Sequence, residues 1–156
     1  MSKLDTMSDS HYIFGALFVL SNRIETVFER VLKRFNVTIK QWFLSIIVEN
    51  MLSPPTISEV AKEMGSSHQN IKQIALSLNK KGLLDFEKDP GDNRAILLQL
   101  SGKSNVLWSK VKKDGDSLHN RLFSDISEDD LKATRKVIEK LLSNIEKIEN
   151  SKKSER

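Results

Sequence analysis

The sequence predicts a mainly helical fold with one short β-hairpin. Across most of its 156 residues, apolar side chains recur every three or four positions, which is the period of an α-helix. Between residues 83 and 100 the period falls to two, and turn-forming residues divide that stretch. Because 38% of the residues are hydrophobic and 29% are charged, we expect one globular domain, 1–156, with a buried core.

The first predicted helix covers residues 10–35 and has a broad apolar face. One apolar series recurs at spacings of three or four and consists of Ile13, Leu17, Leu20, Ile24, Val27 and Val31. A second series consists of Phe14, Phe18, Phe28, Leu32 and Phe35. Such a face is expected to contact both the parent domain and another surface, and a partner subunit is the simplest candidate.

Two capping boxes predict where the next helices begin. Thr38 and Gln41 have the spacing at which each side chain satisfies an unpaired backbone amide of the other. The helix that they start should stop before Pro54 and Pro55, because proline cannot donate a hydrogen bond inside a helix. A short helix from residue 56 to 63 or 64 follows, and it begins with a threonine and a glutamate at the same spacing.

A third helix is predicted at residues 67–80. Gly65 separates it from the short helix before it, Ser66 and Gln69 have the spacing of another capping box, and Gly82 follows its end. Two short helices joined by a tight turn that contains glycine form a helix-turn-helix pattern, here residues 56–81.

The hairpin follows this pattern directly, over residues 83–100. Apolar residues alternate with acidic ones in its first strand and with other residues in its second, on either side of a turn at residues 89–93. A hairpin placed directly after a helix-turn-helix is a wing.

Two further helices are predicted at the C-terminal end. Ser101 should cap a helix that runs to about residue 121, and Ser127 with Asp130 should start the last helix, 127–149. The last helix has an apolar stripe that resembles a coiled-coil seam. That stripe consists of Leu131, Ile138, Leu141, Ile145 and Ile148.

The composition excludes several classes of protein. Without cysteine there are no disulfides, thiolate zinc sites or cysteine redox sensors. No segment approaches the roughly 18 apolar residues of a membrane span, and the motifs of phosphate-binding loops, zinc proteases and serine hydrolases are absent. We expect a cytoplasmic protein that is not an enzyme, has no cofactor and binds no membrane. No metal site is predicted, although a sensor site built from distant His, Asp and Glu residues stays open.

The order of these elements resembles the MarR (multiple antibiotic resistance regulator) family of bacterial transcription factors. The resemblance covers about residues 10–149, and its most specific parts are "TISEVAKEMGSSHQNIKQIALSLNKKGLL" and "DPGDNRAILLQLS". It implies a winged helix-turn-helix core at 38–121 and dimerisation helices at 10–35 and 127–149. Asn93 stands where the family often has an arginine, Ser104 where it often has a glycine, and acidic residues occupy a first wing strand that is often basic.

The resemblance also implies which residues contact DNA. In helix 67–80, Ile71, Ile74, Ala75 and Leu78 should pack inward, while Ser77 and the polar residues around it should project outward. Amide side chains suit adenine edges, whereas serine and lysine suit phosphates. An ordinary solvated helix face is the alternative. The predicted DNA-binding residues are Ser66, Ser67, His68, Gln69, Asn70, Lys72, Gln73, Lys80, Asp92 and Arg94.

The wing tip has a specific predicted role. Arg94 would enter the narrow minor groove of DNA, where the negative potential is concentrated. Asp92 would orient the guanidinium through charge-assisted hydrogen bonds. A surface ion pair that only stabilises the turn is the alternative.

By the resemblance, the protein is expected to be a homodimeric repressor that binds a pseudo-palindromic site on double-stranded DNA. A small aromatic or anionic effector is expected to release it, and an ordinary aromatic core is the alternative to an effector pocket. The net charge of +4 permits a nucleic-acid partner. A helical dimer that binds proteins through the winged domain is the rival function. The candidate pocket residues are His11, Phe14, Trp42, Phe43 and Trp108.

Overall fold

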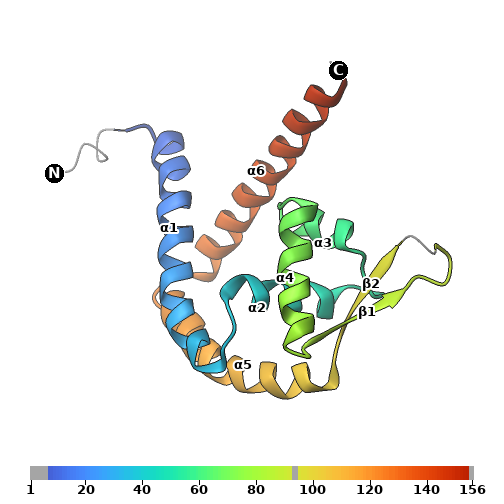
Figure 1. Ribbon diagram of the computed structural model, residues 1–156. Coiled ribbons are helices and arrows are strands. Elements are labelled where there is room, and N and C mark those ends of the chain that lie inside the picture. Colours follow the sequence, from blue (N-terminus) through green and yellow to red (C-terminus); the bar gives the residue numbers. More distant parts are fainter. Residues whose placement is uncertain (1–6, 93–94, 155–156) are drawn as a thin grey trace. The chain divides into compact units, whose positions relative to one another are not determined.

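The structure, a computed structural model, describes residues 7–92 and 95–154, with side chains described as far as residue 151. The chain divides into two compact units, one ending at Leu118 and the other beginning at His119. In chain order the elements are α1 (Asp9–Leu32), the 3-10 turn η2 (Lys33–Phe35), α2 (Ile39–Asn50), α3 (Ile57–Glu63), α4 (His68–Lys80), β1 (Leu84–Lys88), β2 (Ile96–Leu100), α5 (Gly102–Leu122) and α6 (Glu128–Ser154) (Figure 1). The predicted mainly helical fold with one hairpin is confirmed.

Two of the predicted capping boxes are present. At the start of α2, Thr38 Oγ1 accepts from the backbone amide of Gln41 at 3.2 Å, and Gln41 Oε1 accepts from the backbone amide of Thr38 at 3.2 Å. At the start of α3, Thr56 Oγ1 accepts from the Glu59 amide at 3.3 Å, and the Glu59 carboxylate accepts from the Thr56 amide at 2.7 Å. Each pair satisfies two amides that the first helical turn leaves unpaired.

The predicted cap of α4 is wrong by one residue. Ser67, not Ser66, is the N-cap, and its Oγ accepts from the backbone amide of Asn70 at 3.2 Å. Gly65 has a φ of +58°, a left-handed conformation that costs glycine little. Its turn places Ser66 one position ahead of the cap, so the apparent box formed by Ser66 and Gln69 does not start the helix.

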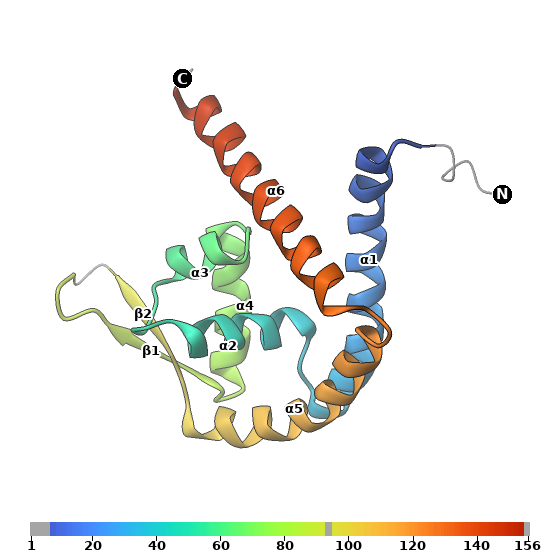
Figure 2. The same cartoon turned by 180° about the vertical axis from the view of Figure 1, so that it is seen from behind.

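The core of the first unit lies where α2, α3 and α4 pack together beside the base of the wing (Figures 1 and 2). The inward face predicted for α4 is confirmed, because Ile71, Ala75 and Leu78 are fully buried and Ile74 packs against the core. The buried apolar residues from the other elements are Leu32, Val37, Leu44, Val48, Ile57, Val60, Ala61, Leu83, Leu84, Leu98 and Val111.

The wing is a two-stranded antiparallel hairpin in which Leu84 lies opposite Leu100. Its second strand is also joined to the segment before α3, since the Leu98 amide donates to the Pro55 carbonyl at 2.8 Å. This bond and the burial of Leu98 fix the base of the wing on the helical core. Gly82, with a φ of +68°, provides the left-handed turn from α4 into the wing.

Helix α1 contributes to the core mainly through its C-terminal end. Leu32 is buried and Phe28 packs against the core, whereas the N-terminal half carries many exposed apolar side chains. The predicted helix over residues 10–35 is confirmed as α1 followed by η2. The exposed apolar residues of α1 are Tyr12, Ile13, Phe14, Leu17, Phe18, Val19, Leu20 and Val27.

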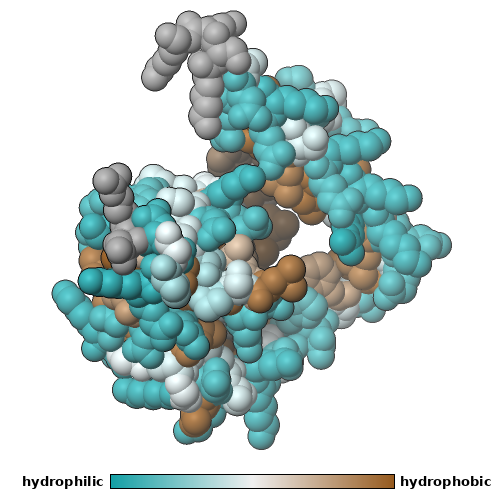
Figure 3. Space-filling model, turned by 90° about the vertical axis from the view of Figure 1, so that its right-hand side faces the viewer, coloured by the Kyte–Doolittle hydropathy of each residue, from teal (hydrophilic) through white to brown (hydrophobic). Residues whose placement is uncertain are grey.

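The second unit is built around α6. The Asp130 amide donates to Ser127 Oγ at 3.1 Å, which confirms the predicted start, and the helix extends beyond the predicted end to Ser154. Among the helices that the structure describes, none has the length and apolarity to cross a membrane. Hydrophobic residues reach the molecular surface among hydrophilic ones (Figure 3). Those of α6 are Val137, Ile138, Leu141, Leu142, Ile145 and Ile148.

Candidate nucleic-acid interface

Helix α4 presents a polar, exposed face opposite its buried one. Its amphipathic pattern requires this, because successive residues are about 100° apart around the helix and those three or four positions apart share a face. No acidic residue occurs in α4, so its lysines carry a local positive charge. Seven of the residues predicted to bind DNA are exposed here and an eighth, Ser66, is half-buried. The seven are Ser67, His68, Gln69, Asn70, Lys72, Gln73 and Lys80.

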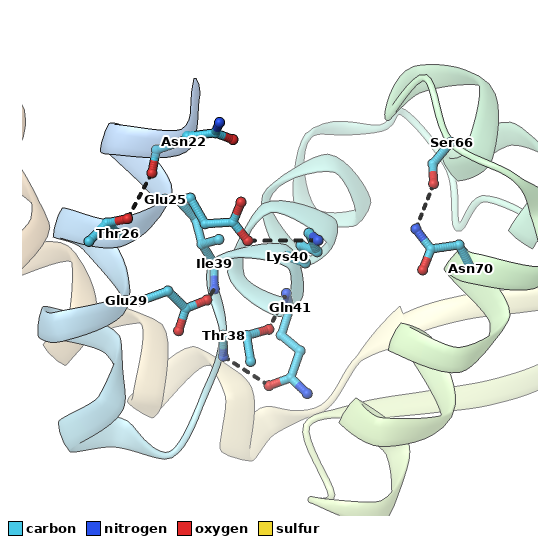
Figure 4. Close-up of polar contacts among 10 residues, drawn as sticks. All are labelled: Asn22, Glu25, Thr26, Glu29, Thr38, Ile39, Lys40, Gln41, Ser66 and Asn70. Atoms are coloured by element: carbon cyan, nitrogen blue, oxygen red, sulfur yellow. Dashed lines mark hydrogen bonds and ion pairs between the residues drawn. The ribbon is translucent and has the colours of Figure 1, made fainter. Parts of the chain in front are cut away.

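At the N-terminal end of α4, the Asn70 side chain has a fixed position. Its Nδ2 donates to Ser66 Oγ at 2.8 Å (Figure 4), while its backbone amide is held by the Ser67 cap. One predicted DNA-binding residue therefore orients another. An amide that is already held loses less side-chain entropy when it meets a base edge.

The C-terminal end of α4 differs from the prediction at Ser77. Its Oγ accepts from Gln41 Nε2 at 2.8 Å, and the residue is half-buried against α2 rather than outward-facing. Gln41 also accepts from Lys81 Nζ at 2.9 Å. The capping spacing of Gln41 is visible in the sequence, but these contacts span 36 and 40 positions, and no local pattern indicates them.

Among the charged side chains that are exposed on the described part of the wing, three are acidic and one, Lys88, is basic. Asp85 and Glu87 are exposed on β1, and Asp92 is exposed near the tip. The tip is closed by backbone bonds from Asp89 to Ala95 at 3.2 Å and from Ala95 to Asp92 at 2.9 Å. Arg94, to which the minor-groove role was assigned, lies outside the described residues.

Glu59 is the titratable group whose environment clearly changes its pKa in the described part of the chain. Its carboxylate accepts hydrogen bonds from the backbone amide and the hydroxyl of Thr56, which lower its pKa from the ordinary value of 4.5. Burial and the nearby Asp89 carboxylate oppose this effect. The pKa shift thus belongs to a helix cap, as its causes are the bonds of the capping box.

The five candidate pocket residues do not come together within one chain. Trp42 stacks on Phe28, with ring centroids 5.9 Å apart. Phe14 lies fourteen residues before Phe28 on α1, which is about 21 Å along a helix. His11, Phe14 and Phe43 are exposed, whereas Trp42 and Trp108 pack against the core. The indole Nε1 of Trp108 is buried without a hydrogen-bond partner among the described residues.

An open surface pocket of about 330 Å³ lies where the end of α1, the start of α2 and the end of α4 meet. None of the five candidate residues lines it. Three of its seven lining residues are cationic and one is a carboxylate. The lining residues are Glu29, Arg30, Lys33, Asn36, Val37, Thr38 and Lys81. Among residues 7–92 and 95–154, no group of three His, Asp or Glu side chains is placed to hold a metal ion.

These elements form a winged helix-turn-helix fold, and comparison with known proteins shows which proteins the chain is similar to. No protein-family model matches the sequence. A 92-residue stretch is 28% identical to the transcriptional repressor MprA of Escherichia coli K12 and covers 59% of this chain and 52% of MprA. The chain therefore spans about half the length of the curated relatives that it matches.

Solved structures resemble most of the chain. Staphylococcus aureus MarR in complex with salicylate and kanamycin has a TM-score of 0.74 at 20% identity, covering 88% of this chain and 93% of that one. The S. aureus MepR–DNA complex has a TM-score of 0.74 at 19% identity, covering 88% and 99%. The chain has the winged helix-turn-helix fold of the MarR-family transcriptional regulators.

Proposed function

We propose that this chain is a MarR-family transcriptional regulator that binds double-stranded DNA through α4 and the wing. The observation that carries the proposal is the exposed face of α4, which has amides, hydroxyls and lysines and no acid. An α-helix fits the major groove, where amide side chains pair with adenine and lysines neutralise phosphates. Arg94 in the minor groove, oriented by Asp92, stays a prediction from the sequence.

The proposed regulator acts as a homodimer. A single α4 reaches only a few base pairs, whereas a two-fold pair places two such helices about 34 Å apart along a pseudo-palindromic site. The exposed apolar side chains of α1 and α6 support this assembly, because single chains rarely expose so many in one helix. We infer that these two helices supply the contacts between subunits.

Repression and release by an effector are the finer parts of the proposal. The matched relative MprA is named as a repressor, and the S. aureus MarR structure holds salicylate and kanamycin. An effector pocket built from His11, Phe14, Trp42, Phe43 and Trp108 would need residues from both subunits, since one chain keeps His11 and Phe14 far from Trp42. The indole Nε1 of Trp108 is buried and has no hydrogen-bond partner within the described part of the chain, which supports a hydrogen-bond acceptor on the ligand.

The decisive test is selection of a binding site from a random duplex library by the purified full chain. We expect a two-fold-symmetric sequence to be enriched. Its affinity for the chain should fall steeply as the salt concentration rises, because lysines that bind phosphates release cations from the DNA. Failure to enrich any duplex at low salt would contradict DNA binding. That result would favour the protein-binding adaptor instead, which the exposed acids Asp85 and Glu87 of the wing support.

A further inference from the structure

The C-terminal end of α4 is joined to the start of α2 by a buried polar network. Gln41 is only 5% exposed. Its Oε1 accepts from the Thr38 amide at 3.2 Å and from Lys81 Nζ at 2.9 Å, and its Nε2 donates to Ser77 Oγ at 2.8 Å. Lys81 Nζ also donates to the Asn36 carbonyl. One side chain thus bonds the helix cap of α2, the last turn of α4 and the residue that caps α4.

The same junction also includes the end of α1. Glu29 in α1 accepts from the Ile39 amide at 2.8 Å, and Glu25 forms an ion pair with Lys40 at 3.7 Å (Figure 4). The connection between the helices turns at Asn36, which has a left-handed φ of 56°. Polar contacts therefore run from α1 through the start of α2 to the end of α4.

These hydrogen bonds restrict the rotation of α4 about its own axis, which apolar packing alone does not restrict. Ile71, Ala75 and Leu78 hold α4 against the core, but apolar contacts are not directional. Ser77 and Lys81 are four positions apart and so lie on nearly the same side of the helix. Because both bond to Gln41, they resist rotation of α4 about its own axis.

Rotation about this axis matters for base readout. Gln73 lies one turn before Ser77 in the same row of side chains and is exposed. A side-chain end about 6 Å from the helix axis moves about 1 Å for a rotation of 10°. Side chains in a binding site must lie within about 0.5 Å of their productive positions. A small rotation of α4 would therefore misplace Gln73 on a base edge. The same rotation would affect phosphate contacts little, because lysine binds phosphate as a point charge on a flexible side chain.

We propose that Gln41 and Lys81 are positioning residues that set the rotation of α4 and tie base readout to the junction of α1 and α2. This inference rests on the proposed DNA binding. It distinguishes Gln41 from Ser45, which is also buried in α2 but donates only to the Gln41 carbonyl of its own helix, at 2.9 Å. A displacement of α1 at this junction would rotate α4 through the same bonds, and would thereby shift the side chains of α4 that contact the bases.

The test compares Gln41→Met, which keeps the side-chain volume and removes the bonds, with Ser45→Ala as the matched control. The probes are the duplex that the wild-type chain selects and a scrambled duplex of equal length. We expect Gln41→Met to lower affinity for the selected duplex about tenfold and to leave affinity for the scrambled duplex within about twofold. Ser77→Ala, which leaves the cap of α2 intact, should lower specific affinity in the same sense.

A conservative variant separates positioning from folding. Gln41→Glu keeps the acceptor for the Thr38 backbone amide and Lys81 Nζ. Its second carboxylate oxygen can accept from the Ser77 hydroxyl, which in the wild-type chain accepts from Gln41 Nε2. This variant should therefore restore most of the specific affinity that Gln41→Met loses. If Gln41→Met lowers affinity for both duplexes equally, or if Gln41→Glu binds no better than Gln41→Met, the positioning role is wrong.

Amide hydrogen exchange tests the link without DNA. In Gln41→Met the amides of Lys81, Gly82 and Leu83, which close the end of α4, should exchange faster than in Ser45→Ala, because local opening is less costly. Equal exchange in the two variants would overturn the inference even if the wild-type chain binds DNA. If the wild-type chain selects no duplex while exchange does differ, the proposed function fails, the link between α2 and α4 stands, and its role in base readout is overturned.

Discussion

The proposed function requires two kinds of DNA contact, to phosphates and to base edges, and two adjacent residues of α4 allow each kind to be tested by itself. Lys72 and Gln73 are both exposed. Lys72→Ala should weaken binding to the selected and scrambled duplexes alike and reduce the slope of log affinity against log salt by about 0.9, because one phosphate contact is lost. Gln73→Ala should weaken only the selected duplex, by about tenfold or more, and leave the slope unchanged.

Fluorescence anisotropy at several salt concentrations measures both quantities. Lys110→Ala is the matched control for charge, since Lys110 is exposed on α5 and belongs to neither α4 nor the wing. A salt slope that changes as much in Lys110→Ala as in Lys72→Ala would argue that only net charge matters.

A second prediction at the scale of single residues concerns pH. The folded chain lowers the pKa of Glu59 below its ordinary 4.5 through hydrogen bonds from Thr56. The resulting stabilisation is complete above pH 4.5 and is lost as the pH falls through the lowered pKa, because the folded chain must then take up a proton it binds weakly. Urea unfolding from pH 6 to pH 3 should therefore show a smaller stability advantage of the wild-type chain over Glu59→Gln at acid pH. A difference that does not change with pH would contradict the capping role of the carboxylate.

At the scale of elements, the start of α4 provides a test of cap assignment. Ser67→Ala removes the acceptor for the Asn70 amide and should reduce the free energy of unfolding by about 1 kcal/mol. Ser66→Ala removes only the side-chain bond to Asn70 and should cost less. Chemical denaturation of both variants measures the difference, and a larger loss for Ser66→Ala would place the cap at Ser66 after all.

The caps also show how much of the fold the sequence determines. Thr38 with Gln41 and Thr56 with Glu59 act within four residues, so their spacing predicted the starts of α2 and α3 correctly. The cap of α4 was misplaced because Gly65 adopts a left-handed turn, which shifts the helix start by one residue. Local spacing does not determine such a shift, since it depends on the backbone angles of the preceding turn.

In the candidate interface, too, the local features were predictable from the sequence and the long-range contacts were not. The exposed face of α4 follows from helical periodicity, whereas the inward position of Ser77 follows from its bond to Gln41, 36 positions away. The sequence alone gave no sign of that bond. Long-range polar contacts depend on how helices pack, and packing follows from the whole core rather than from one segment.

At the scale of the whole molecule, the proposed dimer depends on apolar side chains that a single chain leaves exposed. On α6, Leu141 and Ile145 are 37% and 51% exposed and lie in a stripe flanked by charged residues. Replacing both with lysine would place like charges in the seam between two copies, which is strongly unfavourable when they are desolvated. The double substitution L141K/I145K should therefore convert the dimer to a monomer while leaving the first unit folded.

Sedimentation at micromolar concentration measures the outcome. The wild-type chain should sediment at about twice the 17.8 kDa mass of one chain, and the double variant near that mass. Its affinity for the selected duplex should fall at least about 100-fold, because binding two half-sites through one linked pair gains affinity of that order. The control S143K/N150K adds the same charge on the side of α6 opposite the stripe, and should remain dimeric. A wild-type chain that sediments as a monomer yet binds the symmetric duplex with full affinity would refute the paired arrangement, because one copy of α4 would then suffice.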